Sequence, residues 1–299
     1  MPIYERRQRR LAALAEAERS LPISFAIVGV QKAGTSSLYS MLVKHRQVAG
    51  GPQKELRFFL EPRDWGQPDY SDYRRPARGP QSVAGDATPG YLFYPGAMER
   101  IHRYDPGMKL LASFRDPIER AFSHWSMERR RNESYPDLPE AIERYGSDEL
   151  PGPVAADAGP TPLLRGSPFA RGLYGAQLER ALALFPAEQW LLVEFRALLR
   201  DPRAVLDRAT DLLGLPRFAS YPALPRRMAG PTTNPGPRPS VVAVEGLVRR
   251  YADDLSLFAD LSGLDISAWP TRQAAEGQLA VPELRDRLCD RLGLSRSGS

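Results

Sequence analysis

Short apolar runs alternate along the chain with segments whose apolar residues are spaced as in helices. The runs at residues 23–30, 109–114 and 190–194 are typical of buried central strands in a parallel sheet. Helical spacing follows each run and predicts helices over residues 35–44, 118–131, 173–184, 203–213 and 241–261. The alternation of strands and helices predicts an α/β fold, in which a central parallel sheet is flanked by helices on both faces.

Three stretches rich in Pro and Gly interrupt this alternation. Residues 64–83 are expected to form an exposed excursion, 145–167 a lid or substrate-binding insertion, and 222–239 a further loop. Residues 4–20 are amphipathic and predict a helix ahead of the first strand. We therefore expect an N-terminal helical extension over residues 1–22 and a single domain with loop insertions over residues 23–299.

The net charge of the chain indicates which kind of ligand it binds. The 299 residues carry a formal net charge of +5, with pI ≈ 9.4, which favours an anionic ligand. Basic residues are scattered, and the one dense cluster is expected to be a solvated helix face, so nucleic acid is not the expected partner. That cluster is Arg6, Arg7, Arg9 and Arg10.

Cysteine content and hydropathy exclude further classes. Cys289 is the only cysteine, so an intramolecular disulfide framework and a multi-cysteine zinc site are excluded. No apolar run approaches the roughly 20 residues that cross a bilayer, and the N-terminal segment is too charged for a signal-peptide core. The expected location is the cytoplasm.

The segment FAIVGVQKAGT, residues 25–35, carries the clearest chemical signal. It reads as a buried strand, a glycine-containing turn and a helix start, which together form an anion-binding site. Lys32 adds a mobile positive charge, and Gly34 permits a close approach of the backbone. The predicted binding residues of the turn are Lys32, Ala33, Gly34, Thr35, Ser36 and Ser37. A phosphate or sulfate group is the expected guest.

Three classes of protein compete for this turn. A dinucleotide-binding fingerprint requires G-x-G-x-x-G, and the sequence G-V-Q-K-A-G lacks the second glycine. A Walker A loop requires lysine after the last glycine, whereas Lys32 lies inside the loop; this weakens a P-loop small-molecule kinase without eliminating it. A non-catalytic RNA- or anion-binding module rests on the positive charge alone.

The order K-x-G-T-[ST] after a strand resembles the 5′-phosphosulfate loop of sulfotransferases that use 3′-phosphoadenosine 5′-phosphosulfate (PAPS). Residues 115–123, RDPIERAFS, resemble the 3′-phosphate motif of the same family, R-x-P-x-x-R-x-x-S in looser form. Arg115 offers a planar fork for a phosphate, and Ser123 offers a hydroxyl to the same group. The fold implied by the resemblance is a P-loop-like parallel sheet.

Further segments resemble the heparan-sulfate-type branch of this family, in a bacterial member. Residues 54–59, KELRFF, match K-E-x-x-F-F, and residues 85–91, GDATPGY, resemble G-E-x-[ST]-P-x-Y with Asp86 where glutamate is usual. Ala87 stands where some polysaccharide enzymes carry lysine, so a glycosaminoglycan acceptor is not assigned. Two later segments, ending in Tyr174 and Arg238, resemble family segments near the cofactor.

The resemblance implies a sulfotransferase that moves a sulfuryl group from PAPS to a hydroxyl or amine, leaving adenosine 3′,5′-bisphosphate (PAP). Lys32 would stabilise the leaving phosphate, and Glu55 would deprotonate the acceptor; His124 is the rival base. No metal is required by this scheme. The acceptor is a small molecule, lipid, sugar or carrier-bound polyketide that the sequence does not identify, and the oligomeric state is left open.

Overall fold

The computed structural model describes residues 3–16, 19–51, 53–152, 159–225 and 236–294. The chain divides into two compact units. The first unit comprises Met1–Phe114, Gly152–Pro160 and Ala181–Arg226, and the second comprises Arg115–Pro151, Thr161–Arg180 and Arg227–Ser299. None of the helices in the described ranges combines the length and apolar character that crossing a bilayer requires.

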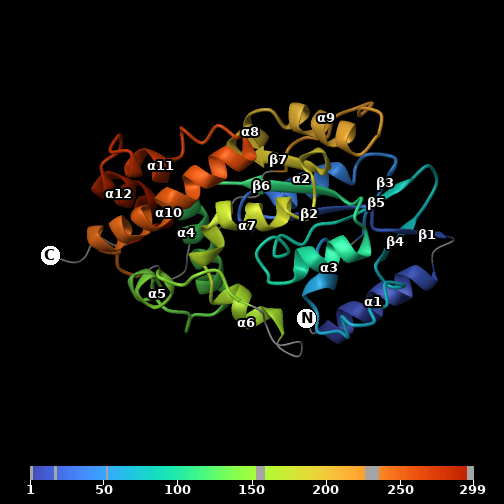
Figure 1. The fold of residues 1–299 in the computed structure, drawn as a ribbon, viewed down its shortest axis with the longest axis horizontal. Helices are drawn as coiled ribbons and strands as arrows, with labels where there is room; N and C mark the ends of the chain where they lie inside the picture. The colour runs from blue at the N-terminus through green and yellow to red at the C-terminus, as the bar shows by residue number, and fades with distance from the viewer. Residues whose placement is uncertain (1–2, 17–18, 52, 153–158, 226–235, 295–299) are drawn as a thin grey trace. The chain divides into compact units, whose positions relative to one another are not determined.

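A five-stranded parallel sheet forms the centre of the first unit (Figure 1). Its strand order is β3-β5-β2-β6-β7, and every neighbouring pair runs parallel. The strands are β3 (Val48–Ala49), β5 (Val83–Asp86), β2 (Phe25–Gly29), β6 (Lys109–Phe114) and β7 (Trp190–Glu194). Because parallel strands end at one edge, the loop after β2 and the chain leaving β6 start from the same edge of the sheet.

Three helices of the first unit pack against one face of this sheet. They are α2 (Thr35–Leu42), α8 (Phe195–Arg200) and α9 (Pro202–Leu212). Alternate residues of the strands, including Phe25 and Ile27 of β2, lie with these helices in one apolar core. Burial of this face is what the apolar strand sequences predict, since both faces of a central parallel strand are covered.

The remaining elements of the first unit lie around the sheet. They are α1 (Ile3–Ala15), α3 (Ala97–Tyr104), the short 3₁₀ turns η1 (Phe58–Leu60) and η3 (Ala187–Gln189), and an antiparallel pair of β1 (Arg19–Pro22) with β4 (Arg74–Ala77).

The second unit is helical. Its elements are α4 (Pro117–Arg131), α5 (Leu138–Tyr145), α6 (Pro160–Arg165, apart from its first residue), η2 (Ala170–Gly172), most of α7 (Tyr174–Leu182), α10 (Val241–Ser262), α11 (Pro270–Ala275) and α12 (Val281–Leu292). Aromatic rings fill its interior, and Phe258 of α10 stacks on Trp269 with ring centroids 5.7 Å apart. Asp116 caps α4 by accepting from the Glu119 amide, and Pro117 occupies the first turn.

The predicted fold class is confirmed by this parallel sheet and its flanking helices. The strands predicted at 109–114 and 190–194 coincide with β6 and β7. The helix predicted over 4–20 ends earlier, because Arg19 and Ser20 pair with β4 as part of β1. The prediction that residues 64–83 are an exposed excursion is wrong for residues 72–77, where Tyr73 and Arg75 are buried.

Candidate active site

The loop between β2 and α2 is held against the neighbouring strand β6. The Val30 amide donates to the Ser113 carbonyl oxygen at 2.9 Å, and the Ser113 hydroxyl donates to the Ala33 carbonyl oxygen at 2.6 Å. Lys32 and Gly34 both have left-handed backbone angles, with φ of 74° and 80°. A lysine in this conformation is uncommon outside tight turns. Hydrogen bonds to Ser113 therefore hold the loop at Val30 and at Ala33.

Gly34 is required here for a reason that the sequence did not indicate. Besides its positive φ, a Cβ at this position would lie 2.8 Å from the Phe195 ring of α8. No side chain fits that space unless Phe195 moves. Glycine at position 34 therefore allows a ligand to approach the backbone, and it also leaves room for the Phe195 ring.

The start of α2 presents backbone donors that the rest of the described structure does not use. The amides of Ser37 and Leu38 donate to the Gly34 carbonyl oxygen. Within the described residues, the amides of Gly34, Thr35 and Ser36 donate to no acceptor. Three such N–H groups at a helix N-terminus, with Lys32 in the preceding turn, suit a phosphate or sulfate oxygen. This donor set fits the phosphosulfate of PAPS.

Glu55 lies close to this loop through an intervening lysine. The Lys54 Nζ donates to the Ser36 Oγ at 3.1 Å and lies 3.3 Å from the Glu55 Oε1. The Glu55 side chain is 44% exposed, so a molecule from solvent can reach its carboxylate. The structure therefore brings together Glu55 and the predicted anion-binding loop, two features 18 or more residues apart in sequence.

A buried arginine fixes the backbone that carries Glu55. The Arg75 guanidinium donates to the carbonyl oxygens of Gln53 at 2.7 Å, Lys54 at 3.0 Å and Gly85 at 3.0 Å. Arg75 makes no ion pair within the described residues, so its charge is stabilised by these carbonyl dipoles and by the Tyr39 ring, whose centroid lies 6.0 Å from the guanidinium carbon. Sequence analysis missed Arg75 because it lies in the segment expected to be exposed.

A buried carboxylate holds the other side of the same segment. The Asp86 Oδ1 accepts from the Leu56 amide and the Thr88 hydroxyl, both at 3.0 Å. Its Oδ2 accepts from the hydroxyls of Tyr73 at 3.1 Å and Tyr91 at 2.6 Å. Burial and this carboxylate raise the pKa of both tyrosines well above the usual range. Asp86 thus has a structural task even though it replaces the usual glutamate of the motif.

Arg115, the first residue after β6, is already engaged in an ion pair. Its Nε donates to the Glu119 Oε2 at 3.0 Å, and the other Glu119 oxygen accepts from Arg291 of α12 at 2.8 Å. Glu119 and Ser123 are four residues apart and lie on one side of α4, and Arg115, which precedes the helix, contacts Glu119. Glu119 therefore lies between Arg115 and Ser123 along the chain and is the residue that contacts Arg115.

His124 directly follows Ser123, so its side chain points about 100° away around the axis of α4, and it is fully buried. Its Nδ1 is 3.5 Å from the Arg120 guanidinium and its Nε2 is 3.8 Å from the Glu128 carboxylate. Arg120 is also fully buried and donates to the Pro168 carbonyl oxygen, and burial lowers the pKa of its guanidinium. The structure does not bring His124 to the side of α4 that carries Ser123.

Tyr174 and Arg238 occupy two different places in the second unit. The Tyr174 hydroxyl donates to the Arg115 carbonyl oxygen at 2.9 Å, and burial raises its pKa. Arg238 instead contacts α12, where it pairs with Asp286 and Asp290. The segment resembling a cofactor-closing loop begins at residue 234, and residues 234 and 235 lie outside the described part of the chain.

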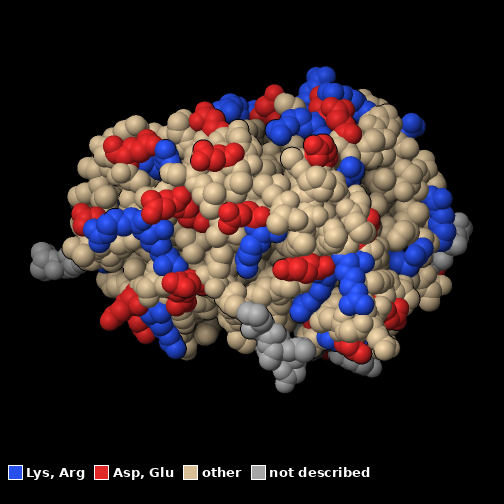
Figure 2. Space-filling view, viewed as in Figure 1, with Lys and Arg blue, Asp and Glu red and all other residues tan. Residues whose placement is uncertain are grey.

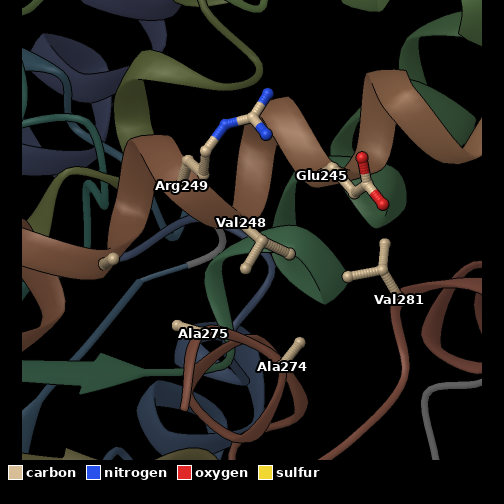
Figure 3. Close-up of a pocket in the computed structure, with 7 residues that line it drawn as sticks. Glu245, Val248, Arg249, Ala274, Ala275 and Val281 are labelled. Atoms are coloured by element: carbon tan, nitrogen blue, oxygen red, sulfur yellow. The ribbon is translucent and has the colours of Figure 1, made fainter. Parts of the chain in front are cut away.

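A separate small pocket lies between α10, α11 and the start of α12 (Figure 3). Val248, Ala274, Ala275 and Val281 lie around it, and Glu245 and Arg249 also belong to its lining. None of the predicted site residues lines it.

On the face drawn in Figure 2, acidic and basic side chains are interspersed, whereas a nucleic-acid-binding surface usually carries a continuous basic stripe.

Comparisons with known proteins agree with these local features. No protein-family model matches the chain. It is 29% identical over 202 residues to human heparan sulfate glucosamine 3-O-sulfotransferase 5, covering 65% of this chain and 54% of that protein. It is 28% identical over 258 residues to mouse heparan sulfate glucosamine 3-O-sulfotransferase 6, covering 80% of this chain and 71% of the relative.

A solved structure gives the same result. The crystal structure of a sulfotransferase from Alicyclobacillus acidocaldarius superposes with a TM-score of 0.64 at 27% identity, covering 83% of this chain and 99% of that one. The chain spans about half the length of the human relative. In sequence and in fold, the chain is therefore similar to PAPS-dependent sulfotransferases over most of its length.

Proposed function

We propose that this protein transfers a sulfuryl group from PAPS to a hydroxyl or amine of a small-molecule, lipid, sugar or carrier-bound acceptor. The observation that carries the proposal is the cluster formed by the α2 amides, Lys54 and Glu55. It combines donors for an anion with an accessible carboxylate, which is the pairing that sulfuryl transfer needs. A kinase would need the same anion site and could use Glu55 in the same way, so the preferred nucleotide is what separates the two functions.

The loop residues are assigned to the 5′ side of the cofactor. Lys32 and the amides of Gly34, Thr35 and Ser36 would bind the 5′-phosphate, with the Thr35, Ser36 and Ser37 hydroxyls and the Ala33 backbone shaping the loop. PAPS supplies a sulfuryl group whose bond to that phosphate breaks as the bond to the acceptor forms, the electron pair staying on the phosphate oxygen. Lys32 then faces the charge that develops, and a fixed cation there lowers the barrier.

The residues at the start of α4 are assigned to the 3′ side. Arg115 and Ser123 would bind the 3′-phosphate, for which a guanidinium fork is suited. Tyr174 supports Arg115 by donating to its carbonyl oxygen. Arg238 is also proposed to bind the cofactor, and to do so it would have to break its ion pairs with Asp286 and Asp290.

The base is assigned to Glu55. Its carboxylate is 44% exposed and lies one lysine away from the loop, whereas His124 is fully buried between Arg120 and Glu128. A base must reach the proton that it removes, and this geometry favours Glu55. Glu55 would take the acceptor proton as the new S–O or S–N bond forms.

The test is nucleotide binding measured by calorimetry, because it needs no knowledge of the acceptor. PAP is expected to bind without a divalent cation, and Lys32→Ala is expected to weaken that binding by about tenfold or more, since it removes a hydrogen bond between charged groups. Lys44→Ala, which changes an exposed lysine at the other end of α2, serves as the matched control. Magnesium-dependent binding of ATP, with no binding of PAP, would support the kinase instead.

A further inference from the structure

Lysine is rare in this chain, and its distribution is uneven. The sequence holds 37 arginines and only four lysines, at positions 32, 44, 54 and 109. Two of the four lie at the candidate active site. An ammonium is a compact charge with three rotatable donors, which a planar guanidinium does not replace. Nearly all basic residues of this chain are arginines, yet positions 32 and 54 of the candidate active site are both lysines.

The Lys54 ammonium lies between the anion-binding loop and the Glu55 carboxylate. It is 3.1 Å from the Ser36 Oγ at the start of α2 and 3.3 Å from the Glu55 carboxylate. Ser36 also supplies one of the three amides that donate to no acceptor within the described residues. A group bound on those amides would have Lys54 on one side and Glu55 just beyond it.

The backbone that carries Lys54 is held by buried charged residues. Arg75 holds the carbonyl oxygens of Gln53 and Lys54, and Asp86 holds the amide of Leu56. The backbone on both sides of Glu55 is therefore fixed, while the Lys54 side chain remains 21% exposed. A group that stabilises charge in the transition state must be held in place before the reaction begins.

We propose that Lys54 is a second cation of the reaction, which donates to an oxygen of the sulfuryl group while Lys32 serves the phosphate. The proposal rests on the function proposed above. Lys54 keeps its protons throughout, and the acceptor proton goes to Glu55. By contacting both Glu55 and the loop, Lys54 also aligns the base with the sulfuryl group that the acceptor attacks.

The test compares two ligands that differ only in the sulfuryl group. Lys54→Met keeps most of the aliphatic stem, and its binding of PAPS and of PAP is measured by calorimetry. The proposal predicts that PAPS binding weakens by about tenfold, the value of a lost charge-assisted hydrogen bond, while PAP binding changes less than about twofold. Lys44→Met is the matched control and is expected to change neither.

Each other outcome overturns the proposal. Equal weakening of both ligands would mean that Lys54 only organises the loop through Ser36. Unchanged binding of both would mean that Lys54 and Glu55 form a surface ion pair and nothing more. Lys54→Gln is measured in parallel, so that a folding defect of one variant does not decide the result. Failure of the unmodified protein to bind PAP would instead refute the function itself.

Discussion

The two candidate anion-binding regions of this protein prepare for their ligands in different ways. In the loop after β2, the amides of Gly34, Thr35 and Ser36 donate to no acceptor among the described residues. At the start of α4, by contrast, Arg115 is paired with Glu119. The first region offers donors that need no rearrangement, whereas the second must exchange a protein carboxylate for a phosphate.

The difference has an energetic consequence. Donors that are fixed before binding cost little to reorganise, so the loop is expected to supply most of the affinity for the nucleotide. The exchange at Arg115 is made easier by Arg291, which also pairs with Glu119 and would keep that buried carboxylate compensated. The second region is therefore suited to discrimination between nucleotides with and without a 3′-phosphate.

The largest expected effect concerns the scaffold of the first region. Arg75→Met removes three hydrogen bonds from a buried guanidinium to backbone carbonyl oxygens and is expected to lower the free energy of unfolding by about 3–5 kcal/mol. Urea unfolding measures it, with the exposed Arg78→Met as control. A loss below about 1 kcal/mol would show that the backbone around Glu55 is not held by Arg75.

The next effect separates the two regions by ligand. Arg115→Ala is expected to weaken PAP binding by about 100-fold, because a charge-assisted contact to the 3′-phosphate is lost. Binding of adenosine 5′-monophosphate, which has no 3′-phosphate, is expected to change less than about twofold. Calorimetry with both nucleotides checks this. Equal losses for the two would contradict the assignment of Arg115 to the 3′ side.

A smaller effect tests the exchange of partners. Glu119→Gln removes the carboxylate that competes with the 3′-phosphate for Arg115, so PAP is expected to bind about threefold more tightly. Glu283→Gln, which breaks the exposed pair of Glu283 with Arg287 on α12, is the control. Weaker binding by tenfold or more would mean that Glu119 orients Arg115 for the ligand.

The smallest effect reports on the packing of α12, the helix that carries Arg291. Burial raises the pKa of Cys289 to about 11, and the thiolate is the reactive form. Reaction with a thiol reagent is therefore expected to be slow at pH 8 and to rise as the pH approaches 11. Rapid reaction of the folded protein at pH 8 would show that α12 is loosely attached.

Sequence reasoning succeeded where the signal was local. The apolar runs located β6 and β7 to the residue, and the turn with Lys32 was recognised from its position after a strand. It failed for Arg75, because only the pairing of β1 with β4 and the contact with residues 53 and 54 make that arginine internal. Lys54 entered the sequence analysis only as part of the K-E-x-x-F-F segment, because its contact with Ser36 joins residues that are distant in sequence.

The partners of Arg115 were likewise hidden. Glu119 falls inside the recognised motif, but Arg291 lies more than 170 residues away, and no pattern in the sequence connects them. Long-range pairings of charged side chains follow from tertiary packing, which hydrophobic periodicity does not specify.

A crystal structure of the protein with PAP tests the central claim most directly. We expect the 5′-phosphate within hydrogen-bonding distance of Lys32 and the amides of Gly34, Thr35 and Ser36. We also expect the 3′-phosphate on Arg115, with the Arg115–Glu119 contact broken. A nucleotide bound elsewhere, or a 3′-phosphate without contact to Arg115, would contradict the claim.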